Sequence, residues 1–449
     1  MYNASIETLS AILLSDNSLI GFEQSPIVLP WSKLEVLLLE RNRLQGSLPI
    51  PQSSIKIYQV QWNLIREMSP LICSLSSLRI LDLSYNNLSG MLHPCLVNFN
   101  SLLFLKLRRN NFSGTIPNTW AKGSKLSLID LSENQFQGQL PRSMANCTLL
   151  EYLHVGNNQM NDTFPFWLGT LSQLKVLVLR SNGFHGRIKS PETNYTFPEL
   201  HILDLSHNSF SGNMPAEYFL HWNAMKVVGE KRSKYMDLSF GGYGSASNVQ
   251  YTIKMTNKGV DLEYEKLQNA LTVIDFSSNR FRGEIPELVG SLEGLHLLNF
   301  SNNVLTGHIP SSLGNLADIE SMDLSQNNLL GEIPQQLVQL FFLASFNVSN
   351  NRLTGPIPHG NQFDTFQNSS FGGNVGLCGN PLSKKCGGYK YTPTSPSPFE
   401  ESQNSGSPFE FGWKVVVIGY GCGFVIGVVI GQILITRKYD WFVKIFGRM

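Results

Sequence analysis

The chain has little charge. Only 15% of its 449 residues are Asp, Glu, Lys or Arg, against about 25% in soluble globular proteins. The 34 basic and 33 acidic residues leave a net charge of +1, which excludes bulk electrostatic attraction to nucleic acid. The sequence also lacks a phosphate-binding loop followed by Lys, a His-Glu-x-x-His motif and any Cys-x-x-Cys pair. We therefore expect no enzyme activity, no cofactor and no metal site.

In place of charge the chain is rich in Asn, with 39 residues, and Gly, with 38. Both follow the pattern Leu-x-Leu-x-x-Asn-x-Leu-x-Gly, which recurs thirteen times, mostly at intervals of 24 residues, as is typical of leucine-rich repeats. The pattern predicts an α/β solenoid with a parallel β-sheet on its concave face and irregular or 3-10 segments on its convex side. The Asn positions are Asn17, Asn42, Asn63, Asn86, Asn110, Asn134, Asn158, Asn182, Asn208, Asn279, Asn303, Asn327 and Asn351.

One coil shows why the pattern makes physical sense. In a short strand, alternate side chains point to opposite faces, so Ile129 and Leu131 are expected to point inward and Asp130 and Ser132 toward solvent. Asn134 then turns inward and satisfies backbone groups that the turn would bury. No coil buries its own apolar face, so its stability comes from its neighbours.

A 71-residue gap interrupts the Asn series and divides the chain. The insertion contains a candidate strand pair around Val249 to Met255 and Gly259 to Tyr264. Long insertions on one face of a solenoid are commonly functional, although a surface loop without contacts remains an alternative. The expected order is nine coils in residues 1–217, an insertion in 218–265, four coils in 266–362, a cap in 363–388, an acidic Pro/Ser-rich linker in 389–412, an apolar span in 413–435 and a basic tail in 436–449.

The cysteines indicate an oxidising compartment. Cys378 and Cys386 are the best disulfide pair, because they form a small loop next to the expected cap. Cys73 and Cys95 are almost one repeat apart and could meet across adjacent coils, but the sequence leaves this pairing open. Cys147 is expected to be a buried free thiol.

Residues 413–435 are apolar over a length that suits one membrane-spanning helix. The tail after them contains four Lys or Arg and one Asp, which places the tail in the cytoplasm and the repeats outside the cell. Within the span, a glycine at every fourth position forms a strip that suits close contact with another helix. These glycines are Gly419, Gly423, Gly427 and Gly431.

The first residues are unusual for a secreted solenoid. The chain enters directly in repeat register, and its first twenty residues contain neither a signal peptide nor a polar cap. We interpret this as a chain whose original beginning is missing, with a short form that starts inside the array as the alternative.

Asn-x-Ser/Thr sequences, which accept N-linked glycans in secreted proteins, support the extracellular interpretation. The candidate glycosylation sites are Asn3, Asn87, Asn111, Asn146, Asn161, Asn194, Asn299, Asn347 and Asn368.

The coils before the insertion differ in the side chains that they present on the strand face. Charged, amide and aromatic residues replace the usual Asp and Ser at several offsets before the Asn, as is typical of binding surfaces. His154, His201 and His207 are expected to be exposed strand residues. We hypothesise a ligand groove here, extended by the insertion, with sequence drift at solvent positions as the alternative. Its candidate residues are Glu40, Arg41, Gln59, Gln61, Trp62, Lys106, Arg108, Arg109, His154 and Arg180.

Several stretches together resemble the plant leucine-rich-repeat receptor-like proteins, particularly the disease-resistance group. They are Asn146-Cys147-Thr148, the segment from Asn161 to Leu168, Lys258-Gly259, and the segment from Gly372 to Pro381. The resemblance implies a plasma-membrane receptor without a kinase domain that binds a peptide, protein or glycan ligand. It also implies an adaptor receptor kinase bound through the glycine strip, and a co-receptor kinase with its own leucine-rich-repeat ectodomain on coils 279 to 351.

Other functions remain open at this stage. An extracellular inhibitor of wall-degrading enzymes would share the repeats but would not need a membrane span. A developmental receptor-like protein and an inert truncated product are further alternatives.

Overall fold

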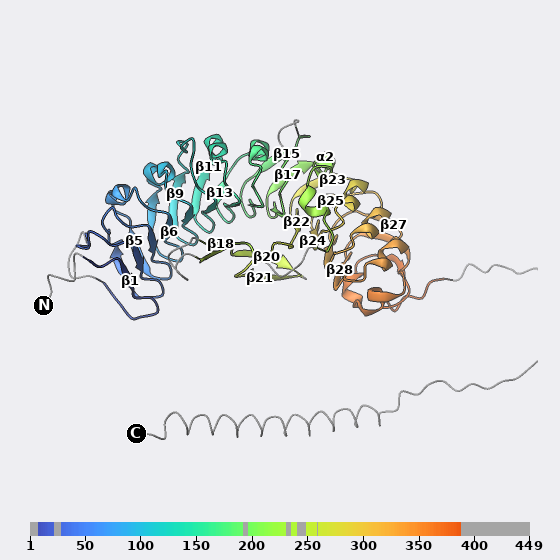
Figure 1. Cartoon of the computed structure of the whole chain (residues 1–449). Helices are drawn as coiled ribbons and strands as arrows, with labels where there is room; N and C mark the ends of the chain where they lie inside the picture. Colours follow the sequence, from blue (N-terminus) through green and yellow to red (C-terminus); the bar gives the residue numbers. More distant parts are fainter. Residues whose placement is uncertain are drawn as a thin grey trace, which may run out of the picture. The chain divides into compact units, whose positions relative to one another are not determined.

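The computed structural model describes residues 8–21, 28–191, 196–229, 235–239, 248–257 and 259–387. These residues belong to one compact unit, in which successive coils stack into an arc (Figure 1).

One parallel sheet runs through the whole stack, and each of the thirteen predicted repeats contributes one strand to it. The solenoid with a parallel sheet is therefore confirmed. Every strand is only three residues long, because the chain must turn after each pass. In spatial order the strands are β1 (Ala11–Leu13), β2 (Val36–Leu38), β4 (Ile57–Gln59), β6 (Ile80–Asp82), β8 (Phe104–Lys106), β10 (Leu128–Asp130), β12 (Tyr152–His154), β14 (Val176–Val178), β16 (Ile202–Asp204), β22 (Val273–Asp275), β24 (Leu297–Asn299), β26 (Ser321–Asp323) and β28 (Ser345–Asn347).

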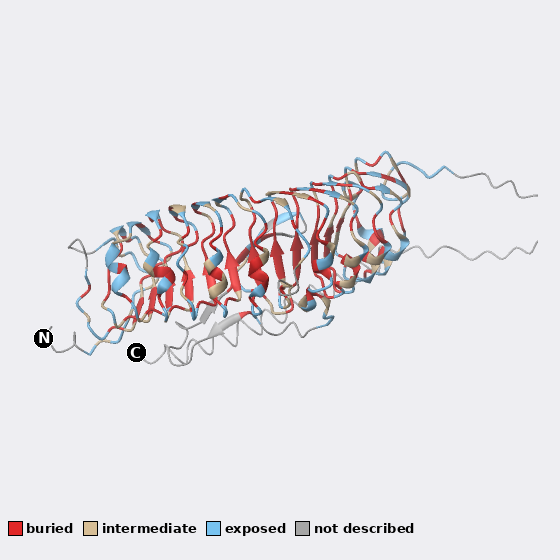
Figure 2. Cartoon of the chain, turned by 90° about the horizontal axis from the view of Figure 1, so that it is seen from above, coloured by how far each residue is buried: buried red, intermediate tan, exposed pale blue. Residues whose placement is uncertain are grey.

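The core is one continuous apolar column inside the coils (Figure 2). As predicted, Ile129 and Leu131 point into it and are fully buried. Burial of apolar surface contributes about 25 cal/mol per Å², and each coil buries much of that surface only against its neighbours.

From the second repeat onward, the Asn of each repeat turns inward and joins neighbouring coils, whereas Asn17 in the first coil is exposed and bonds only to carbonyls of its own coil. Asn134 Nδ2 donates to the carbonyl of Leu107 at 2.9 Å in the preceding coil, and its Oδ1 accepts the amide of Phe112 at 3.1 Å. Its own coil supplies two more carbonyls. Asn374, which the repeat count did not include, continues this column into the cap through the carbonyl of Val348 and the amide of Leu353.

After its strand in the main sheet and the turn that follows, the chain forms a second short strand, and these second strands pair in several smaller sheets. A glycine with positive φ bends the chain at the end of many of them, as at Gly138 in β11, where φ is 77°. These strands are β3 (Gln45–Ser47), β5 (Leu64–Glu67), β7 (Ser89–Met91), β9 (Asn111–Thr115), β11 (Gln135–Gly138), β13 (Gln159–Met160), β15 (His185–Arg187), β17 (Ser209–Gly212), β23 (Arg280–Gly283), β25 (Val304–Leu305), β27 (Leu330–Gly331), β29 (Arg352–Pro356) and β30 (Gly376–Cys378).

The chain then returns mainly through short 3-10 helices, as predicted, many of which start directly after a proline. They are η1 (Pro70–Ser74), η2 (Pro94–Asn98), η3 (Arg142–Asn146), η4 (Phe166–Thr170), η5 (Asn223–Lys226), η7 (Glu287–Ser291), η8 (Ser311–Asn315), η9 (Gln335–Gln339), η10 (Asn361–Thr365) and η11 (Asn368–Ser370), with one α-helical turn, α2 (Ala216–Phe219).

The insertion leaves the stack later than residue 218. Tyr218, Trp222 and Met225 are still buried in the core of the coils. Beyond Gly229 the structure describes two antiparallel strand pairs. The first joins β18 (Asp237–Ser239) to β19 (Asn248–Gln250), and the second joins β20 (Ile253–Asn257) to β21 (Val260–Tyr264). The second pair corresponds to the strand pair expected from the sequence.

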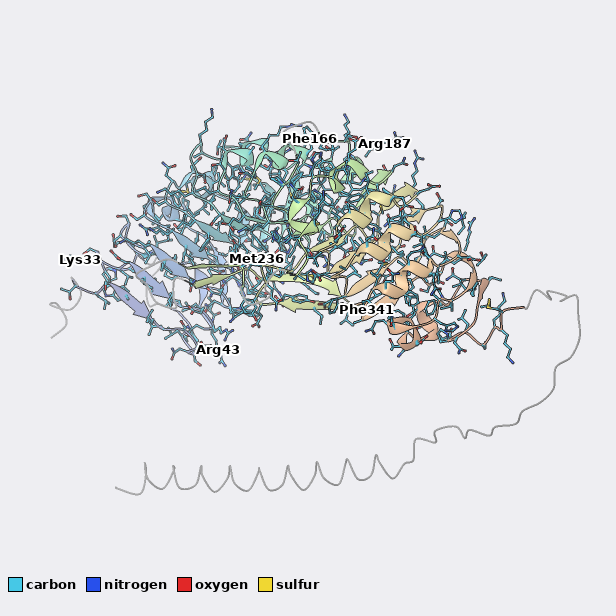
Figure 3. All side chains as sticks on the ribbon, turned by 45° about the vertical axis from the view of Figure 1, so that its right-hand side comes forward. Lys33, Arg43, Phe166, Arg187, Met236 and Phe341 are labelled. Atoms are coloured by element: carbon cyan, nitrogen blue, oxygen red, sulfur yellow. A yellow bond between two sulfur atoms is a disulfide. The ribbon has the colours of Figure 1, made fainter. Side chains whose placement is uncertain are left out.

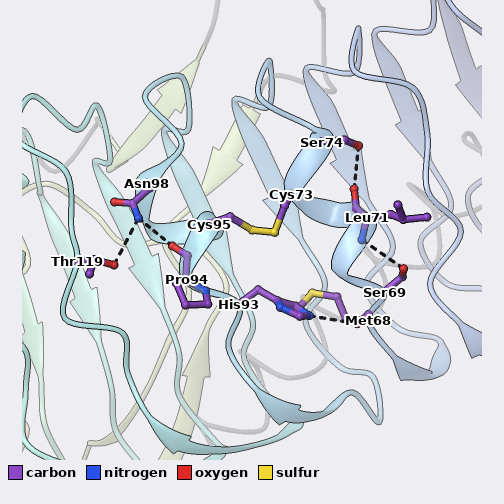
Figure 4. The surroundings of a disulfide bond; sticks show 10 residues. All are labelled: Met68, Ser69, Leu71, Cys73, Ser74, His93, Pro94, Cys95, Asn98 and Thr119. Atoms are coloured by element: carbon purple, nitrogen blue, oxygen red, sulfur yellow. Dashed lines mark hydrogen bonds between the residues drawn. A yellow bond between two sulfur atoms is a disulfide. The ribbon is translucent and has the colours of Figure 1, made fainter.

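Two disulfides are present. Cys73 at η1 and Cys95 at η2 join adjacent coils with their Cα atoms 5.6 Å apart (Figure 4). Cys378 and Cys386 close the loop after β30, with their Cα atoms 4.9 Å apart. Cys147 is a buried free thiol, as expected, and burial raises its pKa to about 11.

The C-terminal cap ends the stack. β30 pairs in parallel with β29, and Phe363, Phe366 and Phe371 cluster around Phe346 of the last repeat strand. Within residues 8–387, where the structure describes the chain with five short gaps, no helix has the length and apolarity needed to cross a bilayer. The predicted span 413–435 with its four glycines, and the sequons at Asn3 and Asn194, are outside the described residues.

Candidate functional site

The insertion lies across the concave face of the sheet (Figure 1). Met236, Tyr251, Ile253, Met255 and Leu267 pack against a row of apolar side chains that the strands direct outward from the coils. This row comprises Val36, Ile57, Ile80, Phe104, Leu128, Tyr152, Val176, Val178, Ile202, Val273 and Leu297. We call residues 235–267 of the insertion the island.

Polar contacts fix the island in place. Glu263 on β21 accepts hydrogen bonds from Arg108 Nη1 at 2.8 Å and from the Tyr85 hydroxyl at 3.0 Å. Tyr152 donates to the carbonyl of Thr252 at 2.7 Å, and Arg180 Nη1 donates to the carbonyl of Lys254 at 3.0 Å. The island is therefore anchored on coils from β6 to β14.

Three of the predicted ligand residues have largely buried side chains, although Arg108 still lines the groove described below. Arg108, His154 and Arg180 are only 4%, 2% and 7% exposed. Burial, followed by the charges of Arg108 and Arg180, lowers the pKa of His154 to about 3, so His154 is neutral and its Nδ1 accepts the amide of Gly156. The prediction that His154 is exposed was wrong because the island and its large neighbours cover it. His201 is half-buried and His207 is exposed.

Asp130 and Ser132 are also buried, contrary to expectation. The Asp130 carboxylate accepts the amide and hydroxyl of Ser132. Burial raises the pKa of Asp130, although Arg108 opposes this shift. On these coils, buried polar groups therefore lie beside the apolar row, and much of the strand face is covered rather than exposed to solvent.

An open groove remains beside the island, toward the first coils. It has a volume of about 490 Å³ and contains six of the ten predicted ligand residues. Trp62 is 48% exposed and stacks on Tyr85, with ring centroids 3.7 Å apart. The groove is lined by Arg41, Gln59, Gln61, Trp62, Asp82, Ser84, Tyr85, Lys106, Arg108, Asp130, Thr252, Glu263 and Glu265.

Guanidinium groups support the stacked rings. The Cζ atoms of Arg108 and Arg109 each lie 5.4 Å from the centre of the Tyr85 ring. Arg109 is exposed and does not line the groove. Glu40 does not line it either, and its Oε2 is buried without a hydrogen bond.

Tyr85 was missed by the sequence reasoning. The sequence could have indicated it, because Tyr85 directly precedes the repeat Asn of its coil, as Trp62 and Arg109 do in theirs. All three have positive φ, from 54° to 60°, which directs their side chains along one edge of the sheet. Glu263 and Glu265 could not be found in this way, because the repeat does not position the insertion.

The sequons differ in accessibility. Asn299 is 7% exposed, lies in β24, and donates to Asp275 while accepting from Ser301, so its side-chain amide is engaged within the fold. Asn347 makes the same contact with Asp323. Asn146 is half-buried and donates to the Trp120 carbonyl. The exposed sequon residues are Asn87, Asn111, Asn161 and Asn368.

No group of three or more His, Cys, Asp or Glu side chains in the described part of the chain is placed to hold a metal ion. The arrangement at the groove suits recognition rather than catalysis, since it combines an aromatic platform with amide and charged groups.

Comparison with known proteins identifies the family of the chain. A family profile described as Leucine Rich Repeat matches residues 77–99, 125–147, 199–219, 270–292, 294–316 and 318–340. Receptor like protein 28 of Arabidopsis thaliana is 47% identical over 443 residues, which cover 98% of this chain and 56% of the relative. Receptor-like protein 34 of the same plant is 52% identical over 284 residues, which cover 63% of this chain and 29% of the relative. The chain belongs to the plant leucine-rich-repeat receptor-like proteins. It spans about half or less of the length of these two relatives.

Two of the solved structures similar to this receptor-like protein are plant receptor kinases. The leucine-rich-repeat ectodomain of the receptor kinase GASSHO1/SCHENGEN3 from Arabidopsis thaliana, in complex with CASPARIAN STRIP INTEGRITY FACTOR 2, aligns with a TM-score of 0.59 and 27% identity, covering 84% of this chain and 45% of that one. The Arabidopsis receptor kinase HAESA, in complex with the peptide hormone IDA and the co-receptor SERK1, aligns with a TM-score of 0.53 and 26% identity, covering 85% and 64%.

After the island, the concave face of this receptor-like protein is uniform. Asp275 pairs with Asn299, and Asp323 pairs with Asn347, each across one strand boundary. Serines follow two residues later in every coil, at Ser277, Ser301, Ser325 and Ser349. This half of the face has no aromatic platform.

Proposed function

We propose that the protein is a single-pass plasma-membrane receptor without a kinase domain, whose extracellular coils bind a peptide ligand and signal in defence. The observation that carries the proposal is the groove beside the island, where the exposed Trp62 stacks on the half-buried Tyr85. The peptide hormone bound to the similar receptor kinase HAESA supports the choice of a peptide.

The groove offers the chemistry that a peptide needs. The ring pair provides apolar contact area at little entropic cost, because stacking already orders it. Gln59 and Gln61 offer amide groups for peptide backbone, although the Gln61 Oε1 is buried without a partner in the described structure. Lys106 adds a positive charge, and the wall on the island side ends in Glu265. A ligand would thus contact both the repeats and the island.

A random peptide library displayed on phage and panned on the full chain tests this proposal. We expect selected peptides to bind the Trp62→Ala and Lys106→Ala variants at least about tenfold more weakly, as for residues at the centre of an interface. Gln326→Ala is the matched control, because Gln326 occupies the position of Trp62 in a coil beyond the island and has a similar φ of 54°. Peptides that bind all three variants equally would place the site elsewhere and refute the proposal.

Signalling requires partners, since the chain has no sequence motif for catalysis. We place a co-receptor kinase on the coils of residues 279 to 351, supported by the co-receptor bound to HAESA. We place an adaptor receptor kinase on Gly419, Gly423, Gly427 and Gly431. Replacement of Gly423 and Gly427 by Leu should abolish co-precipitation of a receptor kinase with the full chain, and unchanged association would contradict the helix contact.

A further inference from the structure

A group of basic side chains lies on the outer side of the arc, away from the island. Figure 3 labels Arg187 there, on the side of the coils opposite Met236 of the island. Arg280 and Arg282 belong to β23 of the same short sheet, and all three arginines are exposed. Among the residues that the structure describes, none of the three makes an ion pair. Arg108 and Arg180 on the concave face do make ion pairs.

Strand register brings these arginines together. Arg187 on β15 pairs with Ser211 on β17, and Ser211 pairs with Arg280 on β23. Two strand spacings of about 4.8 Å therefore separate the backbones of Arg187 and Arg280. Arg282 follows on the same face of β23, because alternate residues of a strand share a face.

Two glycines allow side chains to lean along this row. A Cβ atom at Gly212 would lie 2.7 Å from Cγ of Arg187, so the Arg187 stem crosses Gly212 toward the next coil. A Cβ atom at Gly283 would lie 2.9 Å from Oδ1 of Asn213, which crosses in the same way. The result is a pocket of about 470 Å³ shared by Arg187, Asn213 and Arg282.

The polar lining of this pocket is basic and hydrogen-bonding. Ser190 and Asn213 add a hydroxyl and an amide to the lining, and Glu217 is its one acidic residue. Glu284 follows Gly283 in the chain, but its side chain lies over Gly307 of the next coil. A Cβ atom added at Gly307 would lie 2.6 Å from Cγ of Glu284. Ile188 and Met214, which also line it, are buried, so the pocket has no deep apolar hole for a peptide side chain.

We propose that this pocket is a second binding site, for a linear polysaccharide that carries carboxylates, that is, a polyuronate. Guanidinium groups bind carboxylates as charge-assisted, forked pairs. The hydroxyl of Ser190 and the amide of Asn213 can hydrogen-bond to sugar hydroxyls. The site is independent of the proposed peptide groove, which lies on the opposite face of the coils.

Binding of a polygalacturonate oligomer to the full chain tests the proposal. We expect binding that weakens with added salt, that falls at least about tenfold in an Arg187→Gln/Arg282→Gln variant, and that is absent for the fully methyl-esterified oligomer. Arg352→Gln is the matched control, since Arg352 occupies the repeat position of Arg280 on β29 and should bind within about twofold of the wild type. Circular dichroism checks that each variant is folded.

Three results would overturn the proposal. They are no binding of polygalacturonate, an equal loss in Arg352→Gln, or binding of polyglutamate or the esterified oligomer as tight as that of polygalacturonate. Tight polyglutamate binding would assign the pocket to acidic peptides. Trp62→Ala should leave polygalacturonate binding unchanged, so this test can fail or succeed independently of the peptide groove.

Discussion

The concave face before the island differs sharply from the concave face after it. From β2 to β14 the outward strand positions present Gln59, Lys106, His154 and other large groups, and the island covers many of them. From β22 to β28 the same positions alternate Asp and Asn. The backbone and the Asn column are the same in both regions, so the scaffold does not require either set of side chains. The proposed peptide groove lies in the first region, where the side chains vary most from coil to coil.

The largest effect should come from the shared scaffold. Asn134→Ala removes four hydrogen bonds and leaves buried partners unsatisfied, which should lower the free energy of unfolding by about 4 kcal/mol. Asn327 makes the equivalent bonds after the island, so Asn327→Ala should cost the same in urea unfolding. Unequal losses of unfolding free energy would show that the two regions differ in their scaffold as well as in the side chains on their concave faces.

The docking of the island should respond to changes in the coils before it, which supply its polar anchors and most of its apolar contacts. Tyr152 is 1% exposed and packs against Tyr251 with ring centroids 5.3 Å apart. Tyr152→Ala should weaken docking by about 3 kcal/mol, as for a buried aromatic residue, and should speed amide hydrogen exchange in β20 and β21. Tyr152→Phe keeps the ring and loses only the bond to Thr252, so its effect should be about 1 kcal/mol. Unchanged exchange in Tyr152→Ala would mean that other contacts hold the island.

Much of this fold follows from the repeat alone. The Asn spacing predicts every strand of the main sheet, because each coil must match its neighbour to bury its leucines. The same spacing fixes which residues share a row, and six predicted ligand residues do line one groove. Local periodicity is sufficient for these features.

Contacts between the island and the coils could not be predicted. Arg108 and Glu263 are 155 residues apart, and no periodicity relates them. Without that contact, Arg108, His154 and Arg180 appear exposed, since a strand pattern shows only which face a side chain is on and not what covers it. Exposure on a concave face therefore depends on the insertion.

The region after the island should respond to pH through a buried carboxyl group. Burial, followed by the charge of Asp204 on the neighbouring strand, raises the pKa of Asp275 from 3.8 to about 7. The folded state therefore binds a proton that the unfolded state releases between about pH 4 and pH 7. Stability should fall by about 2 to 3 kcal/mol as pH rises from 5 to 7, measured by urea unfolding.

Asp275→Asn should flatten this profile and raise stability at pH 7, because the amide stays neutral. Asp323→Asn is the control at the same repeat position, which is less buried, and it should leave the profile unchanged. A profile that is flat in the wild type would show that Asp275 is ionised or differently paired.

The smallest effect should come from the ion pair between the island and the coils. Glu263→Gln keeps the shape of the side chain but removes the charge that faces Arg108 and Tyr85. Glu263 is about half exposed and Arg108 keeps its second partner, Glu133, so the loss in docking should be only about 0.5 to 1 kcal/mol. Hydrogen exchange in β21 should depend on salt in the wild type and not in the variant. If salt affected both alike, the island would be held by its apolar face alone, and the contrast between the two regions would be one of packing rather than of charge.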